Sequence, residues 1–272
     1  MWWSWRRYGF WLVKNLTKLD TFDDYLSNFD NASSAFASHL LDASDIHRQP
    51  HPYVTGDGTP MDFWDFSGWP LIPQNKGLQD PKILTPHLIN HVNPNAKFVL
   101  IFREPAERLY SDYLFLGLGK PSPKAFHRKV EKSIVMFQRC KRKLSLRLCS
   151  FSRELHVTMP VRLYIGMYST YLIEWLKVFP IQQFMFIRNE DYSKNINGTL
   201  EETFRFLDLE PLSNKTLEQI ASSRRVHKTE TKQKAGKMET RTRKLLKDFY
   251  APFNRQLTAI VNDLRFLWKD VK

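Results

Sequence analysis

The 272-residue sequence lacks several features that mark unusual classes of protein. It has no low-complexity tract and no internal repeat of 20 to 50 residues, which argues against a disordered chain and against a solenoid. No apolar run approaches the roughly 18 residues needed to cross a bilayer. Acidic residues are scarce, with 28 Asp and Glu against 41 Lys and Arg, so the net charge is +13. This balance favours a polyanionic partner, for which nucleic acid, anionic lipid and sulfated glycan all qualify.

The apolar content is sufficient for a sizeable core. Hydrophobic residues make up 42% and aromatic residues 14% of the chain, and the length favours one domain over residues 1–272. The basic residues are uneven: ten Lys and Arg against two Glu lie between Arg224 and Lys247, and a second cluster lies between Arg139 and Arg147. Solvated helix faces are the alternative explanation for both clusters.

The amino-terminal stretch MWWSWRRYGFWLVKNL is aromatic and basic. It lacks the apolar core and the small-residue cleavage site of a signal peptide. We interpret it as an internal segment of a longer protein, whose packing partner precedes Met1. An amphipathic membrane anchor is the alternative.

Cysteine is nearly absent, but the two residues present are close in sequence. Cys140 and Cys149 have eight residues between them, a distance that one disulfide can close. Two buried thiols are the alternative. Asn-x-Ser/Thr sequons are slightly more frequent than the roughly one or two expected by chance. They lie at Asn15, Asn31, Asn197 and Asn214. Together, the cysteine pair and the sequons favour an oxidising secretory lumen.

The hydrophobic pattern alternates between short strands and longer helices. The predicted strands are Tyr53–Thr55, Lys97–Phe102 and Gln183–Ile187. The predicted helices are Glu104–Leu116, Lys124–Arg139, Val161–Val178 and Thr240–Leu267, with shorter ones over Phe22–Phe29, Thr85–His91 and Leu200–Leu207. This alternation predicts an α/β fold with a mainly parallel sheet flanked by helices.

The most informative stretch is KFVLIFREPAERLYSDY, residues 97–113. A buried strand ends at Phe102, and Pro105 stands where a helix begins. Ligands of open α/β sheets bind at the carboxyl ends of the strands. There, Arg103 can offer a two-pronged contact to a phosphate, and Ser111, two helical turns later, can donate its hydroxyl to the same group. The alternative is an Arg103 that pairs with a neighbouring glutamate.

The run Arg-Glu-Pro-Ala-Glu-Arg-Leu-Tyr-Ser-Asp-Tyr resembles the 3′-phosphate-binding motif of Golgi carbohydrate sulfotransferases. The resemblance is greatest to the branch that acts on the 6-hydroxyl of N-acetylgalactosamine 4-sulfate. Further matches, which extend it over nearly the whole chain, are Trp2-Trp3 with Arg6 to Gly9, the spacing of Cys140 and Cys149, Met159 to Leu163, Phe184 to Asp191, and Asp248 to Asn254.

The resemblance implies a P-loop-like sulfotransferase fold and transfer of a sulfuryl group from 3′-phosphoadenosine 5′-phosphosulfate to a glycosaminoglycan hydroxyl. The implied acceptor is N-acetylgalactosamine 4-sulfate in chondroitin or dermatan sulfate. Arg103 and Ser111 match the family's 3′-phosphate ligands. The implied compartment is the Golgi lumen, with any membrane attachment through an anchor outside this sequence. No metal is required, and His87 and His91, four residues apart, lack an evident third ligand.

The sequence departs from the family pattern at its start. The family's Lys-x-Gly-Thr-Thr loop, which holds the 5′-phosphosulfate, and a Glu-Pro-His stretch with the catalytic base are both missing. We therefore expect the fold to lack its first strand and that loop. Activity of this chain alone stays an open question, and a catalytically inactive glycan-binding module is the alternative to an enzyme.

Other candidate site residues are less specific. Asp57, in a Gly-flanked turn, matches the place of an acidic residue in the family and is a candidate base, although turn formation is the commoner role of such an Asp. Arg224, Arg225 and Lys228 match a basic loop that covers donor and acceptor in related enzymes, with a solvated loop as the alternative. No nucleic-acid-binding motif is present, so we expect no nucleic-acid partner.

Overall fold

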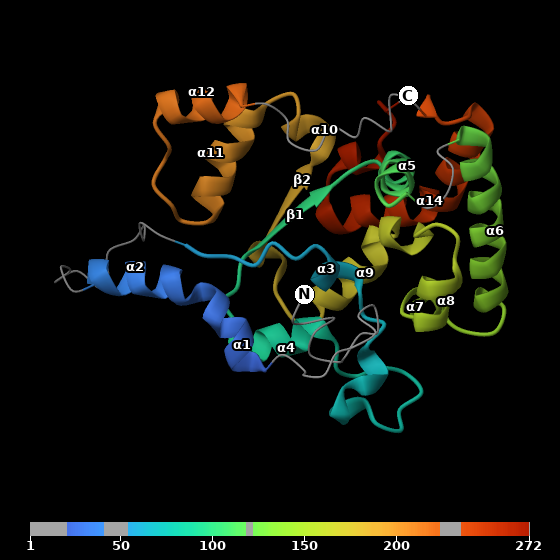
Figure 1. Cartoon of the computed structure of the whole chain (residues 1–272), viewed down its shortest axis with the longest axis horizontal. Coiled ribbons are helices and arrows are strands. Elements are labelled where there is room, and N and C mark those ends of the chain that lie inside the picture. The colour runs from blue at the N-terminus through green and yellow to red at the C-terminus, as the bar shows by residue number, and fades with distance from the viewer. Residues whose placement is uncertain (1–20, 41–53, 118–121, 224–234, 272) are drawn as a thin grey trace.

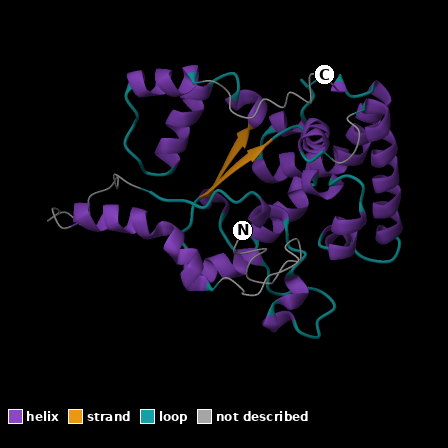
Figure 2. Cartoon of the chain, in the orientation of Figure 1, coloured by secondary structure: helices purple, strands orange, loops and turns teal. Residues whose placement is uncertain are grey.

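The computed structural model describes residues 21–40, 54–117, 122–223 and 235–271 (Figure 1). Helices surround a small sheet of two strands, as Figure 2 shows. Strand β1 (Phe98–Phe102) lies parallel to β2 (Phe184–Arg188), and the register pairs Phe98 with Phe184 and Phe102 with Arg188. This pairing confirms the expected α/β architecture with a parallel sheet.

The chain between β1 and β2 forms a long helical crossover, which parallel strands require. Its elements are α5 (Pro105–Phe115), α6 (Pro123–Lys141), α7 (Leu146–Ser150), α8 (Arg153–Thr158), η5 (Leu163–Gly166), α9 (Tyr168–Leu176) and η6 (Ile181–Gln183). Before β1 lie α1 (Phe22–Leu26), η2 (Ser27–Phe29), α2 (Asp30–Leu40), α3 (Met61–Trp64), η3 (Trp69–Leu71), η4 (Pro73–Asn75) and α4 (Thr85–Val92). After β2 come α10 (Asn189–Tyr192), α11 (Ile196–Phe206), α12 (Asn214–Ser222), α14 (Thr240–Val261) and η7 (Leu264–Leu267).

The strand predicted at Tyr53–Thr55 is wrong for its described residues. Val54 and Thr55 lie outside regular structure, and the side chain of Val54 is half exposed. Their β-branched character suggested a buried strand. The Gly-flanked turn that follows directs the chain over the surface instead, and Tyr53 lies outside the described residues.

Two predicted helices are interrupted. The segment 161–178 divides into η5 and α9 at Met167, whose ψ of 56° is not helical, and a Cβ at the preceding Gly166 would lie 2.8 Å from Cε1 of Tyr250. The carboxyl-terminal helix α14 ends at Val261, since Asn262 adopts a left-handed conformation with φ of 55°. Asp263 then caps the separate turn η7.

The core beneath the sheet is built largely from aromatic rings. Phe102, at the end of β1, stacks on Tyr168 with ring centroids 4.5 Å apart. It also contacts Phe63 from the segment before β1 and Phe266 from η7. Because these rings come from distant parts of the sequence, the end of β1 is fixed from several directions.

An arginine shared by three segments helps to tie the long connection 56–86 to the helices. Arg147 of α7 binds both carboxylate oxygens of Glu174 in α9, through Nε at 2.9 Å and Nη2 at 3.1 Å. The same guanidinium donates to Asp80 and to the carbonyl of Pro81. This guanidinium therefore holds the connection against two helices.

The cysteine pair forms the expected disulfide. Cys140, near the end of α6, is bonded to Cys149 of α7, with the Cα atoms 5.9 Å apart.

Among the described residues, no helix combines the length and apolar character that a bilayer crossing requires.

Candidate active site

The carboxyl end of β1 leads directly into α5. Pro105 is the first residue of that helix, and the carboxylate of Glu104 accepts a hydrogen bond from the N–H of Glu107 at 2.7 Å, which caps it. The hydroxyl of Tyr168 donates to the carbonyl of Arg103 at 2.9 Å. The backbone at Arg103 is thus held from both sides, while its side chain keeps 31% of its surface exposed.

The ends of the two strands are joined by one carboxylate. Glu190, just after β2, accepts from the N–H of Glu104 at 2.9 Å and from the indole N–H of Trp268 at 3.0 Å. Burial raises the pKa of the Glu104 carboxyl and raises the pKa of Tyr168 to about 12. Tyr168 therefore stays protonated and remains a donor at neutral pH.

Arg103 belongs to a chain of charges on the surface of α5. Its guanidinium lies 3.5 Å from Glu107, so the pairing expected as an alternative role is present. Glu107 also binds Arg243 of α14, at closer range. Since Arg243 compensates the carboxylate, Arg103 can turn toward a phosphate without leaving Glu107 uncompensated.

Ser111 lies one helical turn beyond Glu107 in α5 and is partly exposed. Residues four apart occupy the same face of a helix. The side chain of Arg103 reaches Glu107 on that face, so the guanidinium and the Ser111 hydroxyl lie along one side of α5. The two residues predicted to bind a phosphate thus lie on one side of α5 with Glu107 between them, and their joint contact with a phosphate stays a prediction.

A partly buried network of side chains supports α5, and the sequence interpretation missed it. Arg108 donates to the carbonyl of Arg162 at 3.0 Å and lies 3.6 Å from Asp112. Asp112 in turn accepts from Nε of Arg162 at 2.9 Å. Tyr250 of α14 donates to the carbonyl of Leu163 at 2.8 Å, and burial raises its pKa. The sequence feature that could have indicated this network is Arg108, the second arginine of the Arg-Glu-Pro-Ala-Glu-Arg run. Its contact with Arg162 depends on the tertiary fold.

This strand-to-helix site lies within the segment that matches a known family. Residues 59–259 match the sulfotransferase domain. The chain belongs to the sulfotransferase domain family. It is 35% identical to carbohydrate sulfotransferase 15 of Homo sapiens over 275 residues and 34% identical to that of Rattus norvegicus over 271 residues. Each alignment covers 98% of this chain and 48% of the relative, so the chain spans about half the length of the curated relatives it matches.

A solved sulfotransferase from Alicyclobacillus acidocaldarius is also similar in structure, with a TM-score of 0.44 and 15% sequence identity. The similarity covers 85% of this chain and 92% of the bacterial chain.

The candidate base Asp57 forms a turn. Its Oδ1 accepts from the backbone N–H of Thr59 at 2.9 Å and from the Thr59 hydroxyl, and its Oδ2 accepts from the Tyr25 hydroxyl at 3.3 Å. These contacts provide the turn-forming role that was its alternative interpretation. Its role as a base remains a prediction.

The basic residues Arg224, Arg225 and Lys228 lie outside the described residues. The segment that carries them resumes at Ala235, and the carbonyl of Gly236 accepts from the Tyr110 hydroxyl of α5 at 3.0 Å. Tyr110 directly precedes Ser111, so the described end of the basic segment lies beside the candidate site.

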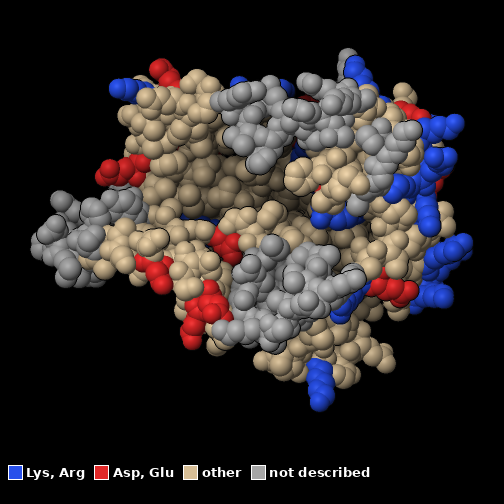
Figure 3. Space-filling model, viewed as in Figure 1, with Lys and Arg blue, Asp and Glu red and all other residues tan. Residues whose placement is uncertain are grey.

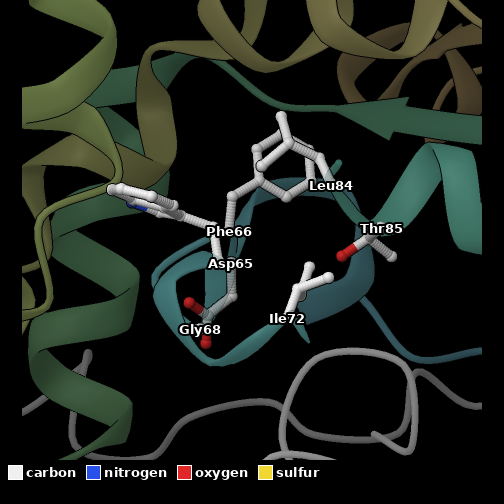
Figure 4. A pocket seen from close by; sticks show the side chains of 7 residues that line it. Asp65, Phe66, Gly68, Ile72, Leu84 and Thr85 are labelled. Atoms are coloured by element: carbon white, nitrogen blue, oxygen red, sulfur yellow. The ribbon is translucent and has the colours of Figure 1, made fainter. Parts of the chain in front are cut away.

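The other predicted positions belong to helices and loops other than β1 and α5. His87 accepts a hydrogen bond from the N–H of Leu84 at the start of α4, and burial lowers its pKa. Asn31 and Asn214 are exposed and Asn197 is partly exposed, whereas Asn15 lies outside the described residues. A small pocket appears in Figure 4, and neither Arg103 nor Ser111 lines it. Its lining residues are Asp65, Phe66, Gly68, Trp69, Ile72, Leu84 and Thr85.

Proposed function

We propose that this sulfotransferase domain binds the nucleotide part of 3′-phosphoadenosine 5′-phosphosulfate and acts in sulfuryl transfer to a glycosaminoglycan hydroxyl. The placement of Arg103 and Ser111 along one side of α5, at the carboxyl end of β1, carries the proposal. The family match over residues 59–259 supports the choice of donor.

Two features of the site suit a phosphate. A guanidinium can form paired, charge-assisted hydrogen bonds with phosphate oxygens, and a serine hydroxyl can donate one more. Glu107, the only acidic partner of Arg103 among the described residues, is also bound by Arg243. The side of α5 that carries Arg103 and Ser111 therefore keeps a positive balance.

The proposed reaction is an in-line displacement. The acceptor hydroxyl oxygen forms a bond to sulfur while the bond from sulfur to the 5′-phosphate oxygen breaks, and the hydroxyl proton passes to a base. The products are a sulfate ester and 3′-phosphoadenosine 5′-phosphate. Arg103 and Ser111 contribute by holding the 3′-phosphate, which fixes the donor relative to the acceptor. Asp57 is the candidate base within the described residues, and Arg224, Arg225 and Lys228 are candidates to cover the donor.

The proposed acceptor is the 6-hydroxyl of N-acetylgalactosamine 4-sulfate in chondroitin or dermatan sulfate. Support comes from the motif resemblance and from the identity to carbohydrate sulfotransferase 15 over 98% of this chain. The net charge of +13 suits an acidic polysaccharide. We also propose the Golgi lumen as the compartment, in agreement with the disulfide between Cys140 and Cys149.

Isothermal titration with 3′-phosphoadenosine 5′-phosphate tests the donor site. Arg103→Ala should weaken binding by about 1.5 to 3 kcal/mol, which is roughly 10- to 150-fold in Kd, because it removes a charged hydrogen-bond donor. Ser111→Ala should weaken it by about 0.5 to 1.5 kcal/mol. Arg255→Ala, an exposed arginine of α14, is the control for loss of one positive charge and should leave Kd within twofold. Equal affinities of the wild type and Arg103→Ala would refute the assignment.

A further inference from the structure

Helix α6 has two opposite faces. Phe126 packs against Tyr110 and Tyr113 of α5, and His127 forms a 2.9 Å hydrogen bond with the hydroxyl of Thr242 in α14. Phe137, further along the helix, contacts Phe249 of α14. These contacts, spread along the helix, determine which face of α6 is turned toward the protein and which is turned toward solvent.

The outward face of α6 is basic. At 100° per residue, five exposed cations fall within an arc of about 80° on the side opposite the buried residues. These cations, termed here the α6 basic face, are Lys124, Arg128, Lys132, Arg139 and Arg142. Figure 3 shows Lys and Arg side chains gathered along the edge of the molecule over α6. With a rise of about 1.5 Å per residue, the face extends for roughly 27 Å.

Two carboxylates lie near this face: Glu239 interacts electrostatically with Lys124, and Glu131 is exposed on α6 about 20° outside the arc. None of the five cations forms an ion pair with a carboxylate among the described residues. Glu131, the acidic residue of α6, lies 3.3 Å from His127. A row of five like charges on a single helix costs stability through repulsion, because like charges about one turn apart destabilise a helix. An anionic ligand that spans the row would relieve that repulsion.

The α6 basic face is connected to the candidate active site by a short segment. The carbonyl of Gly236 is bound by Tyr110, next to Ser111, and Thr242 is bound by His127 of α6. Residues 236–242 therefore bridge α5 and α6. Lys237 and Arg241 are exposed on this bridge, although Arg241 also pairs with Glu239 at 2.6 Å. Lys237 thus adds one positive charge to the segment between α5 and the α6 basic face, while Glu239 offsets Arg241.

We propose that the α6 basic face is a docking surface for a sulfated glycosaminoglycan chain, distinct from the site of sulfuryl transfer. It would hold the polymer while one of its sugars occupies the reaction site. The choice of a sulfated glycan among polyanions rests on the proposed function, whereas the surface itself rests on the placement of the five cations.

The shape of the surface favours a polymer over a small anion. A convex helix face has no enclosed cavity, so a single phosphate or sulfate gains few contacts there. A linear chain with an anionic group on each repeat can engage several cations at once, and its affinity grows with the number of simultaneous contacts. Val135 is the exposed apolar side chain within the arc, which leaves little apolar area for insertion into a lipid surface.

The test compares two variants that remove the same charge. The first replaces three members of the face, Arg128→Gln, Lys132→Gln and Arg139→Gln. The second replaces three exposed lysines on other elements, Lys76→Gln, Lys82→Gln and Lys215→Gln. Surface plasmon resonance on immobilised chondroitin 4-sulfate polymer, over a series of sodium chloride concentrations, measures binding of the full 272-residue chain.

We expect the α6 variant to bind the polymer at least tenfold more weakly than the wild type and to show a flatter dependence of log Kd on log salt concentration. The control variant should stay within about threefold of the wild type. Thermal unfolding of both variants checks that the fold is retained. An unchanged affinity of the α6 variant, or equal losses in both variants, would overturn the proposal.

Two further measurements separate this proposal from the proposed function. Titration with 3′-phosphoadenosine 5′-phosphate should give the same Kd for the α6 variant and the wild type. If the wild type binds the glycan through α6 but binds no nucleotide, the proposed function fails and the docking surface stands.

Single-stranded DNA and vesicles containing phosphatidylserine are the other polyanions to be tested. Loss of binding to either of these in the α6 variant, with glycan binding unchanged, would count against a glycan partner.

Discussion

The pairing of Glu107 with two arginines leads to a prediction about nucleotide binding. Arg243 comes from α14, 136 residues beyond Glu107, and contacts the carboxylate more closely than Arg103 does. In Arg243→Ala, Glu107 keeps Arg103 as its partner and holds that guanidinium more tightly. Arg243 is thus a positioning residue, and its loss should weaken nucleotide binding indirectly.

The expected size follows from the geometry. The Arg103 to Glu107 separation of 3.5 Å is long for a charge-assisted hydrogen bond, and the Arg103 side chain is 31% exposed. Partly exposed ion pairs contribute about 1 kcal/mol or less, so Arg243→Ala should raise the Kd for 3′-phosphoadenosine 5′-phosphate by roughly two- to fivefold. Isothermal titration measures this change directly.

A double-mutant cycle separates indirect from direct action. Glu107→Gln removes the competing carboxylate, so Arg103 should bind the phosphate at least as well as in the wild type. In that background, Arg243→Ala should change Kd by less than twofold. If Arg243→Ala remains several-fold weaker after Glu107→Gln is added, Arg243 contacts the phosphate itself and the reasoning is wrong.

Two predictions concern stability. Arg147→Ala should lower the free energy of unfolding in urea by about 3 kcal/mol, because it leaves the 4% exposed Glu174 with Lys177 as its remaining partner. Lys177→Ala should lower it by less than about 1 kcal/mol, because the Lys177 side chain is exposed. Equal losses would contradict this ranking. Burial raises the pKa of Glu104 in the folded state. The free energy of unfolding of the wild type, relative to that of Glu104→Gln, should therefore fall as pH rises above about 4.3, the unfolded-state pKa. The difference should become constant above the folded-state pKa. A pH-independent difference between the two unfolding curves would exclude this linkage.

Local sequence patterns correctly predicted the elements that carry the candidate site. The apolar run before Arg103 forms β1, and the helix that follows begins at Pro105, because a proline favours the first turn and Glu104 supplies a capping carboxylate. The disulfide was also predictable, since the chain has only two cysteines and they lie close together.

Two of the incorrect predictions have a cause outside the local sequence. Val54 and Thr55 have strand-forming side chains, but strand formation requires a neighbouring strand, and these residues instead lead into a turn stabilised by Asp57. The break between η5 and α9 arises where the ring of Tyr250 packs against Gly166. Neither partner is visible in a local hydrophobic pattern.

The strand-to-helix junction at Arg103, the helical position of Ser111, the disulfide and the excess of positive charge could all be predicted from the sequence. Each of them depends on neighbouring residues or on composition. The folded structure was needed to show that Arg243 shares Glu107 with Arg103, that Arg108 bonds to the carbonyl of Arg162, and that α6 turns its basic face outward. Those outcomes depend on contacts between different segments, for example between Glu107 and Arg243, 136 positions apart, and between Arg108 and Arg162, 54 positions apart. Side-chain pattern alone cannot specify such contacts, because they form only when the core brings the segments together.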